Sequence, residues 1–425
     1  MATRRPVALA NEIPAEISTR VSPEEVPARP LEPETFRTQL GTWYHDHARR
    51  LPWRGQHDPY AVWLSEIMLQ QTRVATVIDR YQAFLEKFPT LESLAEADEA
   101  EVLALWSGLG YYRRARLLHR AAQFVMRELR GKLPRKSQSL RTLPGVGDYT
   151  AAAIASIAFG ESVAVVDGNV ERVVLRLLGA DDDGTATSRN LVRDTAKNLV
   201  PPASIGRSRS NPPGNHNQAM MELGATICLP RQPLCLQCPV LDFCRTRGEH
   251  GTPKRKPQKS HVVAHLLALR KNGVSTEVLL ERRAAEASLM PRMLELPPLP
   301  LDAVEGREPV LRLRHAITNT NYYVQIFTEG VTGTSQPVAE DDIFEEDSEE
   351  SSIVDLDKYG VEEAPFVGDA ADTLGKHPLM HAVPATEADL RWMPTMRLNE
   401  LPLTGLARKV LQRLGLMRLP TVRLR

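Results

Sequence analysis

The 425-residue sequence has few cysteines, few aromatic residues and no excess charge of either sign. Lysine and arginine together number 53, and so do aspartate and glutamate. Four cysteines are too few to build a disulfide scaffold for a chain of this length. No apolar run approaches the roughly 18 residues that a membrane span needs, and the first ten residues lack the apolar segment of a signal peptide. We therefore expect a cytoplasmic protein that does not bind membranes.

What the sequence does contain is ordinary globular composition, with 42% hydrophobic and 25% charged residues. Its length suits two or three domains. The charges are unevenly spread, because basic residues dominate 245–260 and acidic residues dominate 336–372. A further basic group is formed by Arg113, Arg114 and Arg116. A basic surface that binds a polyanion is therefore compatible with the neutral total.

Hydrophobic periodicity divides the chain into a helical part and a later mixed part. Apolar residues recur at helical spacing over 59–72, 74–88, 94–105 and 113–129, and no strand pattern occurs before residue 227. Strand patterns follow at 262–270, 277–282 and 321–327, and 405–414 reads as a closing helix. We expect a flexible tail at 1–33, an all-α domain at 34–227, a cysteine loop at 228–244, a basic linker at 245–260 and an α+β domain at 261–425 with a mobile acidic insertion at about 336–372.

All the cysteines of the chain lie in one short segment. Cys228, Cys235, Cys238 and Cys244 have the spacing C-x6-C-x2-C-x5-C. Four thiolates this close suit a metal site, either zinc or a four-iron cluster. Zinc ribbons generally use two C-x2-C pairs and only one is present, so the spacing favours a [4Fe-4S] cluster. Four unlinked buried thiols are the alternative that we consider weakest.

A glycine-rich turn at 143–147, Leu-Pro-Gly-Val-Gly, opens a helical segment. The free backbone N–H groups of such a helix start can bind a phosphate, and Gly145 and Gly147 would let a sugar-phosphate backbone approach closely. A plain turn between two helices is the alternative.

Two carboxylates are candidates for catalysis, each with a plainer reading. Glu66 lies in the apolar helical segment Ser65-Glu-Ile-Met-Leu, where burial would raise its pKa and suit a general acid. A solvent-facing helical glutamate is the plainer reading. Asp167 precedes the helix expected at 168–178, where it would stabilise a developing cation. An N-cap without a chemical role is the plainer reading there.

Taken in order, the motifs resemble those of one family, the adenine DNA glycosylases of the helix-hairpin-helix superfamily. The resemblance runs from about residue 35 to 245 and includes the segments at 51–54, 65–72, 108–113, 143–154, 165–170 and 217–224, followed by the cysteine quartet. It implies an all-α helix-hairpin-helix glycosylase domain with an iron–sulfur cluster loop. The implied substrate is double-stranded DNA with adenine opposite 8-oxoguanine or guanine. We expect a monomer, associated with the nucleoid if the source is bacterial.

The resemblance also implies roles for particular residues. Glu66 would protonate adenine, Asp167 would stabilise the sugar cation, and Asn169 would position a phosphate or water beside them. Tyr149 stands where lyase relatives of the endonuclease III branch carry a lysine nucleophile, and a phenol cannot form a Schiff base. The remaining expected DNA contacts are Arg54, Leu69, Gln71, Thr72, Tyr111, Gly145, Gly147, Thr318 and Asn319. Of these, Gln71 and Tyr111 would enter the DNA stack near 8-oxoguanine. The basic group of Arg113, Arg114 and Arg116 would contact phosphates.

The region from 261 resembles the family's Nudix-like domain, which reads 8-oxoguanine. The segments 277–283 and 294–297 fit that outline, whereas 288–295 departs from the usual pattern, and no intact Nudix hydrolase signature is present. Two alternatives to a monofunctional adenine glycosylase remain open at this point. One is an endonuclease III-like glycosylase and lyase acting on oxidised pyrimidines, and the other is a DNA-binding iron–sulfur module without activity.

Overall fold

A computed structural model describes residues 28–203, 211–252, 258–273, 275–287, 289–317, 320–328, 379, 383 and 389–417. The contacts divide the chain into two compact units. The first, called the Asp167 unit below, comprises Met1–Ala48, Val166–Pro201 and Asn215–Pro253. The second, called the Glu66 unit, comprises Arg49–Val165, Pro202–Gly214 and Lys254–Arg425. The expected acidic insertion and all but the end of the expected tail lie outside the described residues.

The helical part of the Glu66 unit is built around large aromatic side chains. Trp63 and Trp106 are fully buried in its hydrophobic core, and Trp53 is nearly so. The helices are α2 (Pro59–Leu69), α3 (Val74–Lys87), α4 (Leu91–Glu96), α5 (Glu99–Trp106), α6 (Arg113–Glu128), α7 (Ser137–Leu140) and α8 (Asp148–Ile157).

The prediction of one continuous helix over 94–105 is wrong, because the chain forms two helices there. Ala97 and Asp98 both have extended backbone between α4 and α5. Thr90 and Ser93 form a capping box that begins α4 at Leu91. Apolar spacing alone carried no sign of the break, whereas the cap residues mark both helix starts.

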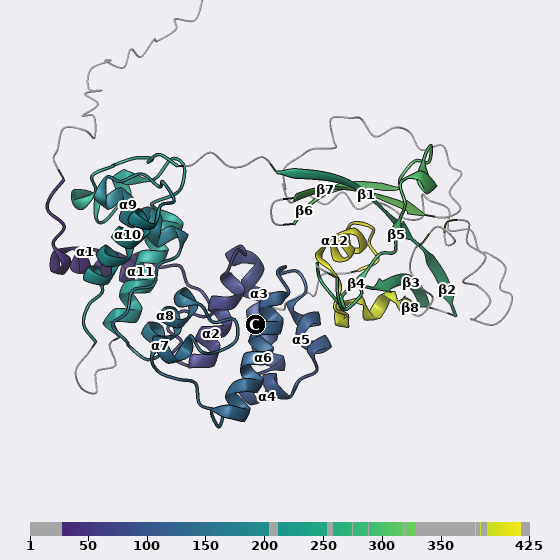
Figure 1. The fold of residues 1–425 in the computed structure, drawn as a ribbon, viewed down its shortest axis with the longest axis horizontal. Helices are drawn as coiled ribbons and strands as arrows, with labels where there is room; N and C mark the ends of the chain where they lie inside the picture. The colour runs from purple at the N-terminus through teal and green to yellow at the C-terminus, as the bar shows by residue number, and fades with distance from the viewer. Residues whose placement is uncertain are drawn as a thin grey trace, which may run out of the picture. The chain divides into compact units, whose positions relative to one another are not determined.

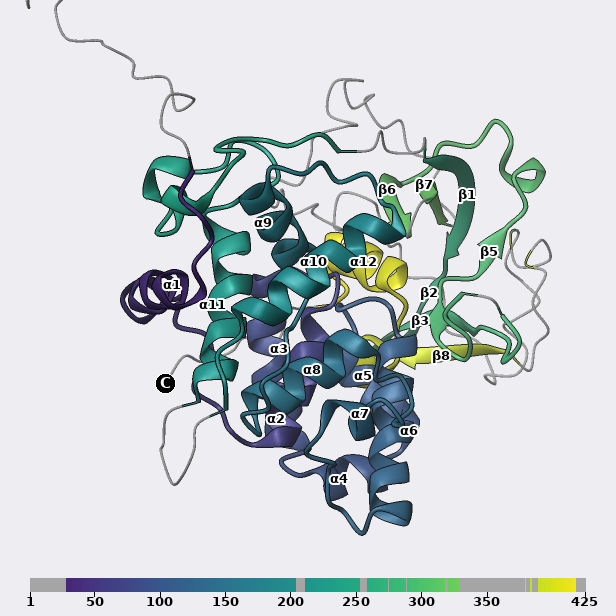
Figure 2. The same ribbon diagram turned by 60° about the vertical axis from the view of Figure 1, so that its left-hand side comes forward.

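Helices α2 and α8 pack directly against each other and are seen side by side in two views (Figures 1 and 2). Asp58 caps α2 by accepting a hydrogen bond from the Tyr60 backbone N–H, and Pro59 occupies the first helical position. The α8 sequence is rich in alanine, and residues 150–157 are all buried. Small side chains let the two helices approach closely, which fixes the face of α2 that carries Glu66.

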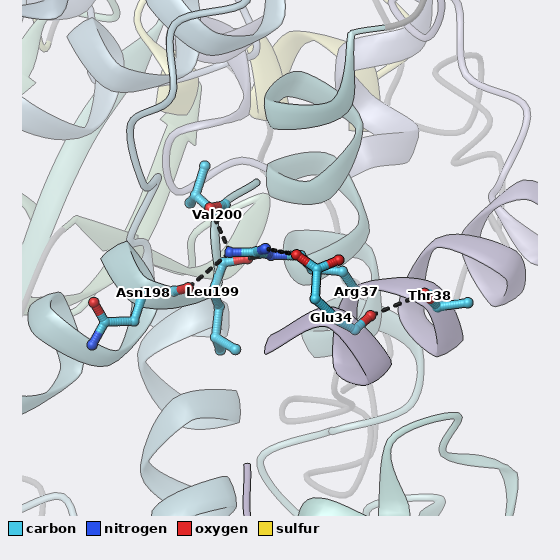
Figure 3. Close-up of polar contacts among 6 residues, drawn as sticks. All are labelled: Glu34, Arg37, Thr38, Asn198, Leu199 and Val200. Carbon is cyan, nitrogen blue, oxygen red and sulfur yellow. Dashed lines mark hydrogen bonds and ion pairs between the residues drawn. The ribbon is translucent and has the colours of Figure 1, made fainter. Parts of the chain in front are cut away.

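The Asp167 unit joins the described N-terminal residues to two later segments. It contains α1 (Pro33–His47), α9 (Gly168–Leu178), α10 (Ala186–Leu199), most of α11 (Pro212–Thr226) and the short 3-10 turns η1 (Cys235–Gln237) and η2 (Leu241–Phe243). Figure 3 shows how α1 holds the end of α10: Arg37 donates hydrogen bonds to the carbonyl oxygens of Asn198, Leu199 and Val200 at 2.7–2.9 Å. Glu34 pairs with the same guanidinium at 3.0 Å.

The C-terminal part of the Glu66 unit contains two sheets. One has the strand order β5-β1-β7-β6, in which β1 (Lys259–Leu267) runs parallel to β7 (Thr320–Thr328), and β6 (Leu311–Ile317) and β5 (Pro298–Leu299) run antiparallel to their neighbours. In the other, β3 (Ser275–Arg282) pairs with β2 (Leu269–Asn272), β4 (Leu294–Glu295) and β8 (Leu390–Pro394).

Helix α12 (Gly405–Arg413) closes the core of this C-terminal part. Its buried face, with Leu406, Val410 and Leu411, packs with Leu280 of β3 and Ile326 of β7. This confirms the mixed α+β character expected after residue 261. The prediction of one strand over 262–270 is wrong, because β1 ends at Leu267 and Ala268 separates it from β2.

No helix among the described residues is long and apolar enough to cross a membrane.

Candidate active site

Glu66 lies on α2 in a buried position that suits a proton donor. Its exposed fraction is 5%, and its helical neighbours Ile67 and Met68 are buried beside it. The Tyr149 hydroxyl of α8 donates a hydrogen bond to Glu66 Oε2 at 2.5 Å. Gln70, the C-cap residue of α2, donates from Nε2 to the Thr150 hydroxyl at 3.1 Å and ties the same two helices together. The plainer reading of Glu66 as a solvent-facing residue is wrong.

The turn before α8 has the geometry that its glycines require. Gly145 has φ +76°, and a Cβ there would lie 2.6 Å from Leu117 Cβ. Gly147 is the N-cap residue of α8 and has open space around it. Leu143 and Val146 of this turn are buried, so the turn is anchored in the core while the start of α8 is open. The arrangement can receive an anion at the N-terminus of α8.

Two expected DNA contacts share an unusual backbone conformation. Gln71, just after α2, has φ +55°, and Tyr111, just before α6, has φ +45°. Both side chains are exposed, Tyr111 by 44% of its surface. Residues other than glycine seldom adopt this left-handed conformation, and it is concentrated at functional sites.

Asp167 is the N-cap residue of α9, as its plainer reading expected, and it has further polar partners. Its Oδ1 accepts a hydrogen bond from the Val170 backbone N–H at 2.8 Å, and its Oδ2 accepts one from Asn169 Nδ2 at 3.0 Å. Both are donors that suit a carboxylate. Asp167 is half-buried, so the capped carboxylate is still reachable.

Behind Asn169, an arginine links α9 to the start of the cysteine loop. Arg172 Nη2 donates to Asn169 Oδ1 at 2.8 Å and to the Gly224 carbonyl at 2.7 Å, and Arg172 Nε donates to the Cys228 carbonyl at 2.8 Å. A Cβ on Gly224 would lie 2.6 Å from Asn169 Cβ, so only glycine allows this close approach. Sequence reasoning missed both residues, although Arg172 lies three residues after Asn169 on the same helix face.

The four cysteines are free thiols, all half-buried. Arg176, 2% exposed, donates to Cys228 Sγ at 3.3 Å and to the Leu229 and Pro230 carbonyls. The Arg247 backbone N–H donates to Cys244 Sγ at 3.4 Å. The segment therefore surrounds sulfur with hydrogen-bond donors and one buried cation.

The cysteines also influence one another electrostatically. Burial raises the pKa of Cys238 to about 12, and the negative charge of thiolates at Cys228, Cys244 and Cys235 acts in the same direction. Burial likewise raises the pKa of Cys228, while the Arg176 hydrogen bond and charge lower it. Such thiols form a suitable donor set for a cationic metal centre, which stabilises thiolates. In the described part of the chain, no three His, Cys, Asp or Glu side chains form a group that could hold a metal ion.

The structure therefore brings together two groups of expected residues. Glu66 and Tyr149 meet within the Glu66 unit, and Asp167 and Asn169 meet within the Asp167 unit. The pairing of Glu66 with Asp167 stays a prediction. Leu69 ends α2, Arg54 closes a turn with Leu51, and Thr72 bonds to Arg114. Thr318 and Asn319 lie outside the described residues.

Comparisons with known proteins agree with this helical fold. Residues 64–202 match the family model of the HhH-GPD superfamily base excision DNA repair proteins. The chain is 43% identical over 226 residues to the adenine DNA glycosylase of Mycolicibacterium smegmatis, covering 52% of this chain and 73% of that protein. The fold and sequence thus define a helix-hairpin-helix base excision repair protein. More narrowly, the chain belongs to the adenine DNA glycosylase family.

Mammalian relatives are also similar over about half of the chain. The human adenine DNA glycosylase is 51% identical over 223 residues, which cover 50% of this chain and 39% of the human protein. The rat protein is 48% identical over 246 residues, covering 55% and 46%. The chain thus matches less than half the length of these mammalian relatives. A solved thermostable thymine-DNA glycosylase is 29% identical, covers 50% of this chain and 95% of that chain, and has a TM-score of 0.45.

Proposed function

We propose that the protein is a monofunctional adenine DNA glycosylase that excises adenine opposite 8-oxoguanine or guanine. The observation that carries the proposal is the buried Glu66 carboxyl, hydrogen-bonded by a tyrosine phenol at 2.5 Å. A carboxyl in apolar surroundings is suited to hold a proton at neutral pH and to give it to a base. Membership of the adenine DNA glycosylase family supports adenine as that base.

Adenine must leave the duplex before its glycosidic bond can be reached, so the substrate nucleotide is extruded into a pocket. Glu66 then protonates adenine N7, and the bond between the sugar C1′ and the base nitrogen breaks with its electron pair going to the base. The deoxyribose becomes cationic, and Asp167 stabilises that charge. Water adds to C1′ and loses a proton, which yields free adenine and an abasic site. Two carboxyl groups with these separate tasks also serve glycoside hydrolysis.

Tyr149 favours base excision without strand cleavage. A lyase needs an amine that forms a Schiff base with the sugar, and the phenol at this position instead donates its hydrogen bond to Glu66. The endonuclease III-like alternative therefore lacks its nucleophile at the expected position. The binding-module alternative is disfavoured because both carboxylates are present with fitting surroundings.

We further propose that Cys228, Cys235, Cys238 and Cys244 hold a [4Fe-4S] cluster. The ligand set of this proposal is four half-buried thiols in one short segment, with Arg176 donating to Cys228 Sγ, although no three of them are gathered into a metal-binding group in the described chain. When bound, the cluster would hold the segment 228–244 in one conformation. The chain's own Arg172 connects that segment to Asn169. Loss of violet absorption and of bound iron in Cys238→Ser would support the assignment, whereas a colourless wild-type protein that contains zinc would overturn it.

The C-terminal α+β part is proposed to be the Nudix-like domain that reads 8-oxoguanine, through a segment that includes Thr318 and Asn319. Replacing both residues by alanine in the full chain should reduce the preference for 8-oxoguanine over guanine opposite adenine. Excision from the adenine–guanine duplex serves as the internal control. An unchanged preference would remove these two residues from the reading of the lesion.

The central experiment is a duplex cleavage assay with and without alkali. Three duplexes carry adenine opposite 8-oxoguanine, adenine opposite guanine, and thymine glycol. We expect strand breakage at the adenine position alone, and only after alkali, because alkali cleaves the DNA strand at an abasic site. Breakage without alkali, or a borohydride-trapped adduct, would favour the lyase alternative. Duplex binding without any excision would favour the binding module.

A further inference from the structure

Arg114, at the start of α6, connects the two segments that carry Gln71 and Tyr111. Its Nη1 donates to the end of α2, to the carbonyl oxygens of Ile67 at 2.7 Å, Met68 at 3.1 Å and Gln70 at 2.5 Å. The last carbonyls of a helix have no partner within the helix, and an arginine there satisfies them and complements the helix dipole.

The other guanidinium nitrogen of Arg114 binds the second segment. Nη2 donates to the carbonyl oxygens of Leu109 at 2.9 Å and Gly110 at 3.2 Å, and to the Thr72 hydroxyl at 3.1 Å. Each Nη carries two hydrogens, so the six acceptors share four donors. One planar guanidinium thus holds two chain segments, the one around Gln71 and the one just before Tyr111.

The guanidinium also contacts the Tyr111 side chain. Arg114 Cζ lies 5.5 Å from the centre of the Tyr111 ring and 5.5 Å from that of the buried Trp106 ring. Both are cation–π distances, and Trp106 gives the guanidinium a fixed support. The exposed Tyr111 ring is therefore held by a group that is itself anchored in the core.

Both segments need such support, because their key residues have unfavourable backbone. Gln71 and Tyr111 each have positive φ, a backbone conformation that L-residues seldom adopt. Burial lowers the pKa of Arg114 to about 10, and the negative charge of ionised Tyr111 opposes that shift, so the guanidinium stays charged at neutral pH. The sequence suggested a phosphate contact for Arg114, but its donors are directed at carbonyl oxygens of the protein.

We propose that Arg114 is the positioning residue that holds Gln71 and Tyr111 together in the conformation that enters the DNA stack. The inference rests on the proposed function, since it assigns a task to these two residues in extruding adenine. Lysine cannot replace this arginine, because an ammonium group has three donors and no planar fork to span two segments. Arg114 acts through the two segments, and we assign it no contact with the reacting base.

The first test needs no DNA. Hydrogen exchange is measured at the Thr72 and Leu109 backbone N–H groups, which bond to Leu69 and Trp106, in Arg114→Lys and Arg114→Met. We expect both amides to exchange at least about tenfold faster in either variant, while the Leu94 amide at the start of α4 changes little. Arg120→Met is the matched control, because Arg120 lies on the same helix, is exposed, and its side chain has no hydrogen bond or ion pair to the described residues.

The second test follows adenine extrusion and excision. A 2-aminopurine placed beside the adenine opposite 8-oxoguanine reports unstacking, and single-turnover kinetics report excision. We expect Arg114→Met to lower the unstacking signal and to slow excision by about 100-fold, with Arg114→Lys in between. Arg120→Met should excise at the wild-type rate. Glu66→Gln should unstack normally without excising, which separates positioning from proton donation.

These outcomes decide the inference separately from the proposed function. Unchanged exchange at Thr72 and Leu109 in Arg114→Met would overturn it, and so would faster exchange at Leu94 to the same degree. Wild-type excision rates in Arg114→Met would overturn it as well. A wild-type protein that fails to excise adenine would overturn the proposed function, while the exchange experiment would still show whether Arg114 holds the two segments.

Discussion

Glu66 and Asp167 have opposite kinds of surroundings, although both are acids at helices. Glu66 lies within a helix, among buried apolar side chains, and accepts a hydrogen bond from the Tyr149 phenol. Asp167 lies at a helix start, half-exposed, and accepts from a backbone amide and from an asparagine that is itself held by Arg172. The first arrangement suits a proton donor and the second suits a fixed negative charge.

The comparison also concerns how each group is supported. Helix packing of α2 on α8 holds Glu66, so its support is mainly apolar and local to that unit. Polar contacts from Arg172 to the start of the cysteine segment hold Asn169 beside Asp167. Substitutions in the two units should therefore impair excision or stability in different ways. Four predictions test this difference.

The largest effects are expected from removing the charge of either carboxylate, in Asp167→Asn and in Glu66→Gln. Asparagine keeps the cap on α9, so folding and duplex affinity should be retained while excision slows by about 1,000-fold. Glu66→Gln should slow excision by roughly 100- to 10,000-fold, as expected for a lost general acid. Single-turnover excision and gel-shift binding measure the two properties. An Asp167→Asn protein with the wild-type rate would contradict the role of the charge.

Gly224→Ala should disturb the Asp167 group from a distance. The added Cβ would lie 2.6 Å from Asn169 Cβ, so Asn169 must move and excision should slow by about 100-fold. We also expect a loss of about 1–3 kcal/mol in unfolding free energy from overpacking. Gly41→Ala is the control, because it is another helical glycine with open space around it. Equal effects of the two substitutions would show that the contact with Asn169 is unimportant.

Tyr149→Phe should have a smaller effect, on the Glu66 group alone. Removing one hydrogen bond worth about 1.5 kcal/mol slows excision by about tenfold, if the phenol orients the acid. Tyr44→Phe deletes a comparable hydroxyl in the other unit, where Tyr44 donates to Gln218 Oε1 at 2.7 Å. That control should leave the rate unchanged. A wild-type rate in Tyr149→Phe would mean that packing of α2 on α8 orients Glu66 without help.

The last prediction concerns His216 in the Asp167 unit. Its effect should appear in the stability of the protein at low pH, with the smallest effect on activity. Burial, followed by the positive charge of Arg37, lowers the pKa of His216 to about 4, from 6.5. The folded state therefore stays neutral while the unfolded state takes up a proton. Neutral His216 therefore leaves the free energy of unfolding at its full value above pH 6.5. That free energy falls as the pH drops towards 4, by on the order of 3 kcal/mol.

Urea unfolding at pH 7.5 and 4.5 measures this loss, with His216→Gln and His45→Gln compared. His45 is exposed, so its substitution should keep the wild-type dependence on pH, whereas His216→Gln should weaken it. The same pH dependence in all three proteins would show that other groups cause the loss.

The sequence predicted those features that depend on local patterns. Apolar spacing located α2, α3 and α6 to within a few residues, and the cap position of Asp167 followed from its place before a helix. The two-residue strands β4 and β5 were missed, because strands so short are defined by their partners and carry no alternation of their own. Their pairing depends on contacts far along the chain.

The arginines show where sequence reasoning failed at the site. Arg113, Arg114 and Arg116 form one basic cluster in the sequence, and all three were expected to meet phosphates. Only Arg113 is exposed; Arg116 instead pairs with Glu99 at 3.1 Å and bonds to the Pro291 carbonyl. Charge alone gave no sign of this, since an arginine bonded to carbonyl oxygens and one facing solvent have the same sequence signal.

The contact between Arg37 and the end of α10 has a consequence for synthesis on the ribosome. Arg37 and Leu199 are 162 residues apart, and the cysteine segment that completes the Asp167 unit is made later still. At roughly 5–20 residues per second, the emerging α1 waits about 8–32 seconds for that partner. The helices between residues 49 and 165 emerge during this interval and can pack with one another first. Helix α1, although it is made earliest, therefore joins its own unit late.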